Sequence, residues 1–210
     1  MLALGDSVTS GSTCDCTAFP QLVADELARR EGHDVGVVNE GIDGLTAADL
    51  VELVSSDDGA DVRGAIADAD LVVVTIGAND VVADTAAGPA TAQAVGSVLT
   101  MIGRLAPGAR VVVTTYWNVD VDGAAAVPDA AERARSDALT RAFNADLAAV
   151  ARARGAAVVD LYAPFKGDGS RDPGPLLLQD GDHPNAAGHQ AIAAAIVTAG
   201  RERRDVSAVT

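Results

Sequence analysis

Four polar segments of this sequence carry the residue types that acyl transfer needs. Residues 5–7 (GDS) offer a hydroxyl nucleophile, and residues 180–183 (DGDH) offer an imidazole with carboxylates beside it. Residues 39–44 (NEGIDG) and 77–80 (GAND) add flexible backbone donors and a carboxamide. A serine needs a base that takes its proton before it attacks a carbonyl carbon, and the charge that develops on the carbonyl oxygen needs hydrogen-bond donors. Together the four segments predict acyl-transfer chemistry.

Each segment also has a common structural interpretation. A Gly-Asp-Ser sequence is most often a turn, a glycine after a strand usually serves a turn that needs a positive φ, and GAND alone is compatible with a capped loop. The spacing of Asp180 and His183 is more specific, because three residues along a turn can bring a carboxylate to the imidazole Nδ1 and fix its tautomer. Asp182 competes for this role, but its position next to His183 favours a side chain that points away. The prediction therefore depends on the four segments occurring together.

Strand-like and helix-like segments alternate along the chain and determine where these residues must lie. Short apolar runs without polar alternation are typical of parallel strands buried on both faces; they occur at residues 1–5, 35–39, 71–76, 110–116 and 156–161. Apolar residues at helical spacing fill the intervals, so we expect an α/β fold, a three-layer α/β/α sandwich around a five-stranded parallel sheet. Ligands of such sheets bind at the carboxyl ends of the strands, where the polar segments stand. Two long loops, roughly 117–127 and 162–184, are also candidates for function.

The same four blocks, the last of them extended to residues 180–189 (DGDHPNAAGH), resemble those of the SGNH (GDSL-type) hydrolases, serine esterases and lipases of flavodoxin-like fold, over nearly the whole chain. The resemblance implies strand order 2-1-3-4-5. It implies Ser7 as the nucleophile, His183 as the general base and Asp180 as the residue that orients the histidine. It further implies an oxyanion hole formed by the Ser7 and Gly44 backbone N–H groups and the Asn79 side-chain amide. The expected activity is hydrolysis of carboxylic esters through an acyl-enzyme.

Two cysteines, Cys14 and Cys16, follow the predicted nucleophile and are separated by one residue. Two free thiols are the expectation inside a cell, and a small disulfide that stiffens the loop is the hypothesis for an exported protein. The CDC segment (residues 14–16) is not a general feature of the family. It resembles the corresponding segment of an actinobacterial-type subgroup, which also carries a run like Tyr116-Trp117-Asn118. His189 is expected in the last helix with a structural role.

Aromatic residues near the predicted strand ends indicate the type of ester. Tyr116 and Trp117 end the fourth strand, whereas Tyr162 and Phe165 begin the loop that leads to His183. Each of these rings has core packing as its alternative, but we expect Tyr116, Trp117 and Phe165 to contact substrate. So few large apolar groups favour a short acyl or acetyl ester, including an acetylated carbohydrate on which an aromatic ring can stack. A lipase or phospholipase that acts on longer chains is the alternative.

Composition limits the class of partner. The 210 residues, 49% of them hydrophobic, fit one domain spanning residues 1–210. A formal charge of −15 makes nucleic acid and anionic membrane surfaces unfavourable partners, so a small-molecule ester is expected. No apolar run approaches the ~18 residues that a membrane span needs. The start of the sequence has no signal-peptide pattern, which predicts a cytoplasmic protein by default and a secreted one if the chain has been trimmed.

Metal and cofactor chemistry has little support in the sequence. Three histidines without an HExxH motif leave a zinc hydrolase short of ligands, and residues 119–123 (VDVDG) have too few carboxylates for a calcium loop. Neither GxGxxG nor a Walker A motif occurs. We therefore expect no metal and no cofactor. The alternatives are a non-catalytic flavodoxin-like module that binds a small anion, and a metal-dependent phosphoesterase that uses the Asp-rich loops.

Overall fold

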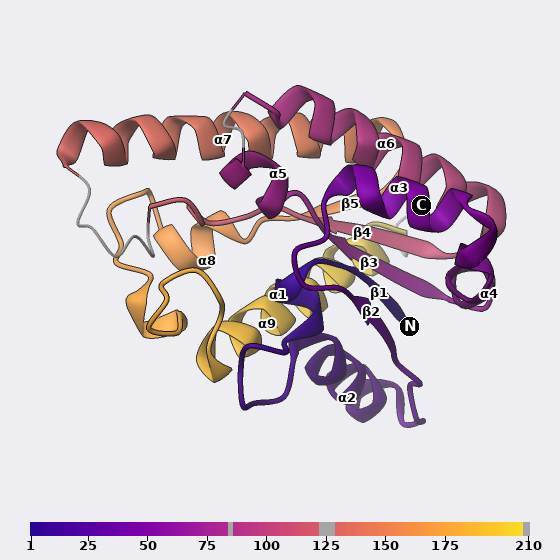
Figure 1. Ribbon diagram of the computed structural model, residues 1–210. Helices are drawn as coiled ribbons and strands as arrows, with labels where there is room; N and C mark the ends of the chain where they lie inside the picture. Colours follow the sequence, from indigo (N-terminus) through magenta and orange to yellow (C-terminus); the bar gives the residue numbers. More distant parts are fainter. Residues whose placement is uncertain (84–85, 122–128, 208–210) are drawn as a thin grey trace.

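The computed structural model describes residues 1–83, 86–121 and 129–207. Five parallel strands form one sheet in the order β2-β1-β3-β4-β5, with helices on both faces (Figure 1). The strands are β1 (Leu2–Gly5), β2 (Val38–Gly41), β3 (Leu71–Thr75), β4 (Arg110–Thr114) and β5 (Ala157–Val159). This arrangement confirms the predicted sandwich and its strand order. Of the predicted loop 117–127, residues 122–127 lie outside the described residues.

Two groups of helices cover the two faces of the sheet. On one face α2 (Phe19–Glu31) packs against α9 (Ala186–Ser207). The other face carries α3 (Ala47–Ser55), α4 (Ala60–Ala67), α6 (Gly88–Leu105) and α7 (Ala130–Ala153). Shorter helical segments lie in the connections: α1 (Ser7–Ser10), η1 (Asp57–Gly59), α5 (Ala78–Ala83), α8 (Tyr162–Lys166) and η2 (Gly174–Leu176). Among the described residues no helix is both long and apolar enough to cross a membrane.

The central strands are buried as expected, but the edge strand β2 differs from its prediction. All residues of β1 and β3 are buried, which their apolar sequences explain. The second strand was expected at residues 35–39 and buried on both faces, yet it begins at Val38, which is 44% exposed. Among the described strands, β2 pairs only with β1, and the register pairs Leu2 with Val38. The observed strand reads Val-Asn-Glu-Gly, and an edge strand with a single neighbour tolerates such polar residues.

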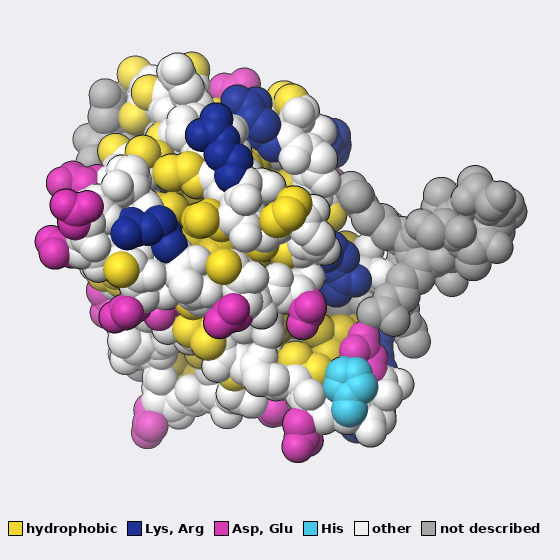
Figure 2. All heavy atoms as spheres, turned by 90° about the vertical axis from the view of Figure 1, so that its right-hand side faces the viewer, with side chains coloured by type: hydrophobic (Ala, Val, Ile, Leu, Met, Phe, Trp, Pro, Cys, Tyr) yellow, Lys and Arg dark blue, Asp and Glu magenta, His cyan; other side chains and the backbone are white. Residues whose placement is uncertain are grey.

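The edge of the sheet formed by the amino ends of the strands carries a cavity of about 360 Å³, lined by residues that include Leu27, Leu71, Arg110 and Ile196. Figure 2 shows this side of the molecule, where acidic, arginine and apolar side chains are interspersed. The four polar segments follow the carboxyl ends of strands, at the opposite edge. This cavity is therefore separate from the candidate site.

Candidate active site

Ser7 stands at a sharp turn from strand to helix. Only Asp6 separates it from the end of β1, and it is the first residue of α1. Asp6 caps this helix, since its Oδ1 accepts a hydrogen bond of 3.0 Å from the Val8 N–H. Only glycine fits at position 5, because a Cβ there would lie 2.1 Å from the Thr75 carbonyl oxygen. The close approach of β1 and β3 thus places the Ser7 side chain at the carboxyl edge of the sheet, partly exposed.

His183 and Asp180 lie in the loop between η2 and α9, and they meet Ser7 at that edge. The His183 Nε2 lies 3.0 Å from the Ser7 Oγ, although the two residues are 176 positions apart. The other ring nitrogen, Nδ1, lies 3.0 Å from the Asp180 Oδ2. The Asp180 Oδ1 accepts the backbone N–H groups of Asp182 and His183, each at 3.0 Å. One tight turn therefore aligns the carboxylate, the imidazole and the hydroxyl.

The two carboxylates beside His183 differ in their surroundings. Partial burial of Asp180 opposes its ionisation, but the backbone hydrogen bonds from Asp182 and His183 and the neighbouring imidazole lower its pKa overall. Burial raises the pKa of Asp182 instead. The surroundings of the carboxylate that faces the imidazole Nδ1 thus favour its charged form, and burial of Asp182 acts in the opposite direction on its carboxylate. The preference for Asp180 over Asp182 stays a prediction.

The segments that carry Gly44 and Asn79 are tied to each other. Gly44 follows β2 with a φ of +77°, which favours glycine. The Asn79 Nδ2 donates to the Leu45 carbonyl oxygen at 2.9 Å, and Asp80 accepts the Ala47 N–H at 3.0 Å. The GAND segment is thus hydrogen-bonded to Leu45, just before α3, and to Ala47, the first residue of α3. These bonds place it beside the NEGIDG segment.

A second link joins the NEGIDG segment to the residues after Ser7. Asp43 accepts hydrogen bonds from the hydroxyl groups of Ser10 and Ser12, and these bonds lower the pKa of Asp43. The Asn39 Nδ2 also donates to the Thr9 carbonyl oxygen at 2.9 Å. Hydrogen bonds therefore join the four polar segments, or the residues that follow them, around one edge of the sheet.

A family model described as the GDSL-like lipase/acylhydrolase family matches residues 3–191. The chain belongs to this family. The protein is accordingly an esterase or lipase, a hydrolase of carboxylic esters. No curated protein matches it.

Solved structures of esterases and lipases share its fold. The lipase Lip_vut3 from a goat rumen metagenome is 20% identical, with a TM-score of 0.79 over 95% of this chain and 96% of that one. The acetylxylan esterase Axe2 from Geobacillus stearothermophilus is 21% identical, with a TM-score of 0.67 over 94% and 92%. A lipase/acylhydrolase from Enterococcus faecalis is 22% identical, with a TM-score of 0.64 over 95% of each chain. At these identities the similarity supports the fold alone.

The aromatic residues expected to contact substrate in this GDSL-family protein are located in the core instead. Tyr116 is 1% exposed, and Trp117 and Phe165 are 0% exposed. The Trp117 and Phe165 rings stack at a centroid distance of 4.1 Å and an angle of 11°. The expectation that these three side chains border the cleft is therefore not supported, because the rings bury one another. These rings pack in the core, which is the alternative that the sequence analysis gave for each of them.

Asp6 is a buried ionisable residue next to the nucleophile that the sequence analysis missed. Its Oδ2 accepts a hydrogen bond of 2.6 Å from the Tyr116 hydroxyl. Burial raises the pKa of Asp6 to about 7, although the bonds from Tyr116 and Val8 act in the opposite direction. The position of Asp6 in the GDS block signals a helix cap, but no local pattern indicates a contact with a tyrosine 110 residues away.

Proposed function

We propose that this GDSL-family esterase hydrolyses short acyl esters through an acyl-enzyme on Ser7. The observation that carries the proposal is the continuous hydrogen-bonded arrangement from Asp180 through His183 to the Ser7 hydroxyl, with 3.0 Å at each step. A serine, an imidazole and a carboxylate at hydrogen-bond distance in this order are the groups that activate a hydroxyl nucleophile.

The mechanism follows from the order of these groups. The Ser7 Oγ attacks the ester carbonyl carbon while His183 Nε2 accepts the hydroxyl proton. The Asp180 carboxylate stabilises the imidazolium that results, and its two backbone hydrogen bonds hold it in place. His183 then returns the proton to the alkoxide of the leaving alcohol. In the second half, His183 takes a proton from water, which attacks the acyl carbon. The bond from that carbon to the Ser7 Oγ then breaks, His183 returns the proton to this oxygen, and the acid leaves.

Three N–H donors would bind the oxyanion in this proposal: the backbone groups of Ser7 and Gly44 and the side-chain amide of Asn79. Ser7 is the first residue of α1, and the first N–H groups of a helix lack partners within the helix. An asparagine amide carries two hydrogens, so Asn79 can bind Leu45 and still donate to substrate. The hydrogen bond to Leu45 would also keep the Asn79 amide next to Gly44.

The rim of the site supports a small polar ester as substrate. Ser10, Ser12 and Asp43 form a hydrogen-bonded group beside Ser7, and Asp180 and Asp182 lie beside His183. Hydroxyl and carboxylate groups offer no apolar surface for a long alkyl chain, whereas an acetyl group on a polar alcohol leaves them hydrated. An acetylated carbohydrate fits this description.

One observation favours a longer acyl chain as the second candidate. A cavity of about 240 Å³ lies between α5, α6 and α7, with mainly apolar lining that includes Val81, Leu139 and Phe143. Val81 is two residues after Asn79. A chain that passed from the oxyanion hole along α5 would reach this cavity, and the protein would then act as a lipase.

Covalent labelling tests the nucleophile. A fluorophosphonate probe reacts with an activated serine, so we expect peptide mapping to find the phosphonyl group on Ser7 and not on the neighbouring Ser10. Ser7→Ala should abolish both labelling and the hydrolysis of aryl acetate, and Ser10→Ala should retain labelling. Ser7→Ala enzyme that still hydrolyses aryl acetate at the wild-type rate would contradict the proposal.

A series of aryl esters tests the acyl chain length. We expect kcat/KM to be highest for acetate or propionate and to fall through butyrate, octanoate and decanoate. A maximum at octanoate or decanoate would support the lipase instead, and Leu139→Trp, which narrows the cavity, should then shift the maximum to shorter chains.

A further inference from the structure

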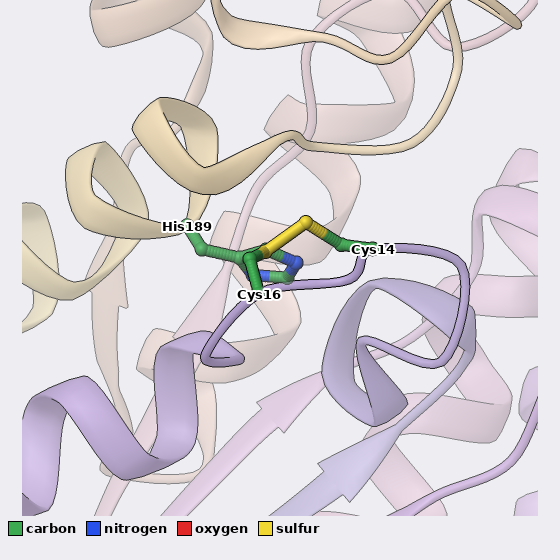
Figure 3. Close-up of side chains that lie close together, drawn as sticks. All are labelled: Cys14, Cys16 and His189. Atoms are coloured by element: carbon green, nitrogen blue, oxygen red, sulfur yellow. A yellow bond between two sulfur atoms is a disulfide. The ribbon is translucent and has the colours of Figure 1, made fainter.

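Cys14, Cys16 and His189 form a cluster that the proposed ester hydrolysis does not use. The two cysteines lie in the loop between α1 and α2 and form a disulfide, with their Cα atoms 5.1 Å apart, within the usual range. Both residues are partly exposed. His189, on α9, lies against them with a ring nitrogen within 4.8 Å of both sulfur atoms (Figure 3).

The tautomer of His189 follows from its hydrogen bond to α2. The backbone N–H of Phe19 donates to the His189 Nδ1 at 3.2 Å. A backbone N–H can only donate, so Nδ1 carries a lone pair and the neutral ring carries its hydrogen on Nε2. Burial lowers the pKa of His189 to about 4, and the ring is therefore neutral at physiological pH.

The Nε2–H of His189 is a buried donor that needs a partner. The side chain is 1% exposed, and Nε2 has no hydrogen-bond partner among the described residues. Buried donors are almost always paired in native proteins. The group that lies nearest to the His189 ring in this cluster is a disulfide, with both sulfur atoms within 4.8 Å of a ring nitrogen. Disulfide sulfur atoms are weak acceptors, whereas a thiolate is a strong one. Opening the disulfide would supply the missing acceptor.

We propose that Cys14, Cys16 and His189 form a thiol–disulfide exchange site, in which the His189 Nε2–H stabilises the thiolate released when a low-molecular-weight thiol opens the disulfide. The attacking thiolate forms a bond to one sulfur atom, and the electron pair of the Cys14–Cys16 bond leaves on the other. A second thiolate then attacks the sulfur atom of the first added thiol in the mixed disulfide, and the remaining protein cysteine leaves as a thiolate. The added thiols are oxidised to their disulfide, and the two cysteines are reduced with the uptake of two electrons and two protons.

Stabilisation of the released thiolate would act on both the rate and the equilibrium. A leaving thiolate with a lower pKa departs faster, and a more stable reduced form makes a disulfide easier to reduce. The partial exposure of both cysteines allows a small thiol to reach them. The contact of His189 with the sulfur atoms is made from α9, so the donor remains in place when the loop opens.

The same three residues match a metal site less well. A metal would need an unprotonated ring nitrogen from His189, but Nδ1 already accepts the Phe19 N–H and Nε2 carries the hydrogen. Coordination at Nε2 would move that hydrogen to Nδ1, opposite the Phe19 N–H, and two donors would then face each other. The geometry therefore favours thiol exchange over metal binding.

A redox titration of three variants tests the proposal. Wild type, His189→Phe and His189→Gln are equilibrated with mixtures of reduced and oxidised dithiothreitol, and alkylated thiols are counted by mass spectrometry. Phenylalanine removes the donor, so the equilibrium constant for reduction should fall about tenfold, which is about 30 mV for a two-electron couple. The glutamine amide can both accept from Phe19 and donate to sulfur, and should restore most of the loss. His33→Phe changes an exposed histidine and should match wild type.

A second measurement needs no variant. The reduced wild-type protein is alkylated with iodoacetamide over a range of pH, and we expect one cysteine to react with a pKa below the ordinary thiol value of about 8.5. Circular dichroism of each variant confirms that it is folded. Equal reduction equilibria in folded wild type and His189→Phe, or an ordinary thiol pKa for both cysteines, would overturn the proposal. So would two thiols that stay free in air-oxidised protein.

Discussion

Two carboxylates flank His183, but only Asp180 is hydrogen-bonded to its ring. Asp180→Asn replaces the carboxylate with an amide that cannot neutralise the imidazolium and that favours the wrong tautomer. We therefore expect kcat for aryl acetate to fall by about 10³–10⁴, as in other enzymes with this arrangement. Asp182→Asn should change kcat by less than about tenfold, because backbone and not side-chain atoms of Asp182 contact the turn.

Stopped-flow or spectrophotometric assays of both variants at neutral pH provide the comparison. Because Asp180 also accepts two backbone N–H groups, thermal unfolding of each variant must accompany the assay. An asparagine oxygen can still accept those bonds, so we expect Asp180→Asn to remain folded. If Asp182→Asn proved the more damaging change, Asp182 would be the residue that orients His183.

The Asn79 amide has two roles in the proposal, and they can be separated. Removing one oxyanion donor typically costs about 10²–10³ in kcat, and we expect this loss for Asn79→Ala. The same change also breaks the hydrogen bond to Leu45. Asp80→Ala breaks a parallel link, to Ala47, and leaves the Asn79 amide intact. Measured kcat values for the two variants distinguish the roles: a comparable loss in Asp80→Ala would assign the effect to loop position.

Chemistry-bearing residues were predictable from the sequence, but the burial of side chains was not. Ser7, Asp180 and His183 could be singled out because residue type and spacing limit what they can do, and the structure brings them within hydrogen-bond distance. For Trp117 and Phe165, a position at the end of a strand predicts the edge of the sheet but not the side to which the ring turns. Their stacking brings the segment that follows β4 against α8, and no local pattern contains this contact.

Helix α1, which begins with Ser7, is capped by a buried carboxyl group that titrates near neutral pH. Asp6 caps α1, and burial raises its pKa from 3.8 to about 7. The folded protein thus holds a proton on Asp6 that the unfolded chain loses above about pH 4. The stability from this proton is fully present below pH 3.8 and is lost as pH rises through about 7. At about 1.4 kcal/mol per tenfold change in proton affinity, the loss is at most about 4 kcal/mol.

Asp6→Asn tests this linkage, because asparagine is an equally good helix cap and does not titrate. We expect the free energy of unfolding in urea to decrease less between pH 5 and pH 8 in Asp6→Asn than in wild type. Tyr116→Phe should act in the opposite direction, since it removes a hydrogen bond that favours the charged carboxylate. Identical pH dependence in wild type and Asp6→Asn would show that Asp6 is ionised throughout this range.

At the scale of elements, the sequence predicted the five strands and the two helical layers, because four strands lie within apolar runs, a fifth apolar run overlaps the start of β2, and each interval has helical spacing. The order of the strands came from the family resemblance, since parallel strands in several orders would bury the same residues. The boundaries of β2 were wrong for a related reason. An edge strand has one neighbour and can be polar, so the apolar run at 35–39 does not mark the residues that pair, which are Val38–Gly41 with Leu2–Gly5.

The charge of the whole molecule should influence which esters reach the site. The sequence has 30 acidic and 15 basic residues, which gives a formal charge of −15, and three of the acidic side chains, Asp43, Asp180 and Asp182, lie around Ser7 and His183. A surface of one sign repels ligands of the same sign over distances comparable to the Debye length. That length is about 30 Å at 0.01 M salt and about 8 Å at 0.15 M. Salt should therefore screen the repulsion of an anionic ester.

Three aryl acetates of similar size, one neutral, one carrying a carboxylate and one carrying a quaternary ammonium group, test this effect in kcat/KM. We expect the anionic ester to be the poorest substrate at 0.01 M salt and to improve severalfold at 0.15 M, whereas the cationic ester should become poorer. The neutral ester controls for salt effects on the enzyme itself and should change little. Asp43→Asn removes one charge from the rim but keeps an acceptor for Ser10, so it should reduce the salt dependence of both charged esters. If kcat/KM of all three esters responded equally to salt, the net charge of the molecule would have no effect on which esters reach the site.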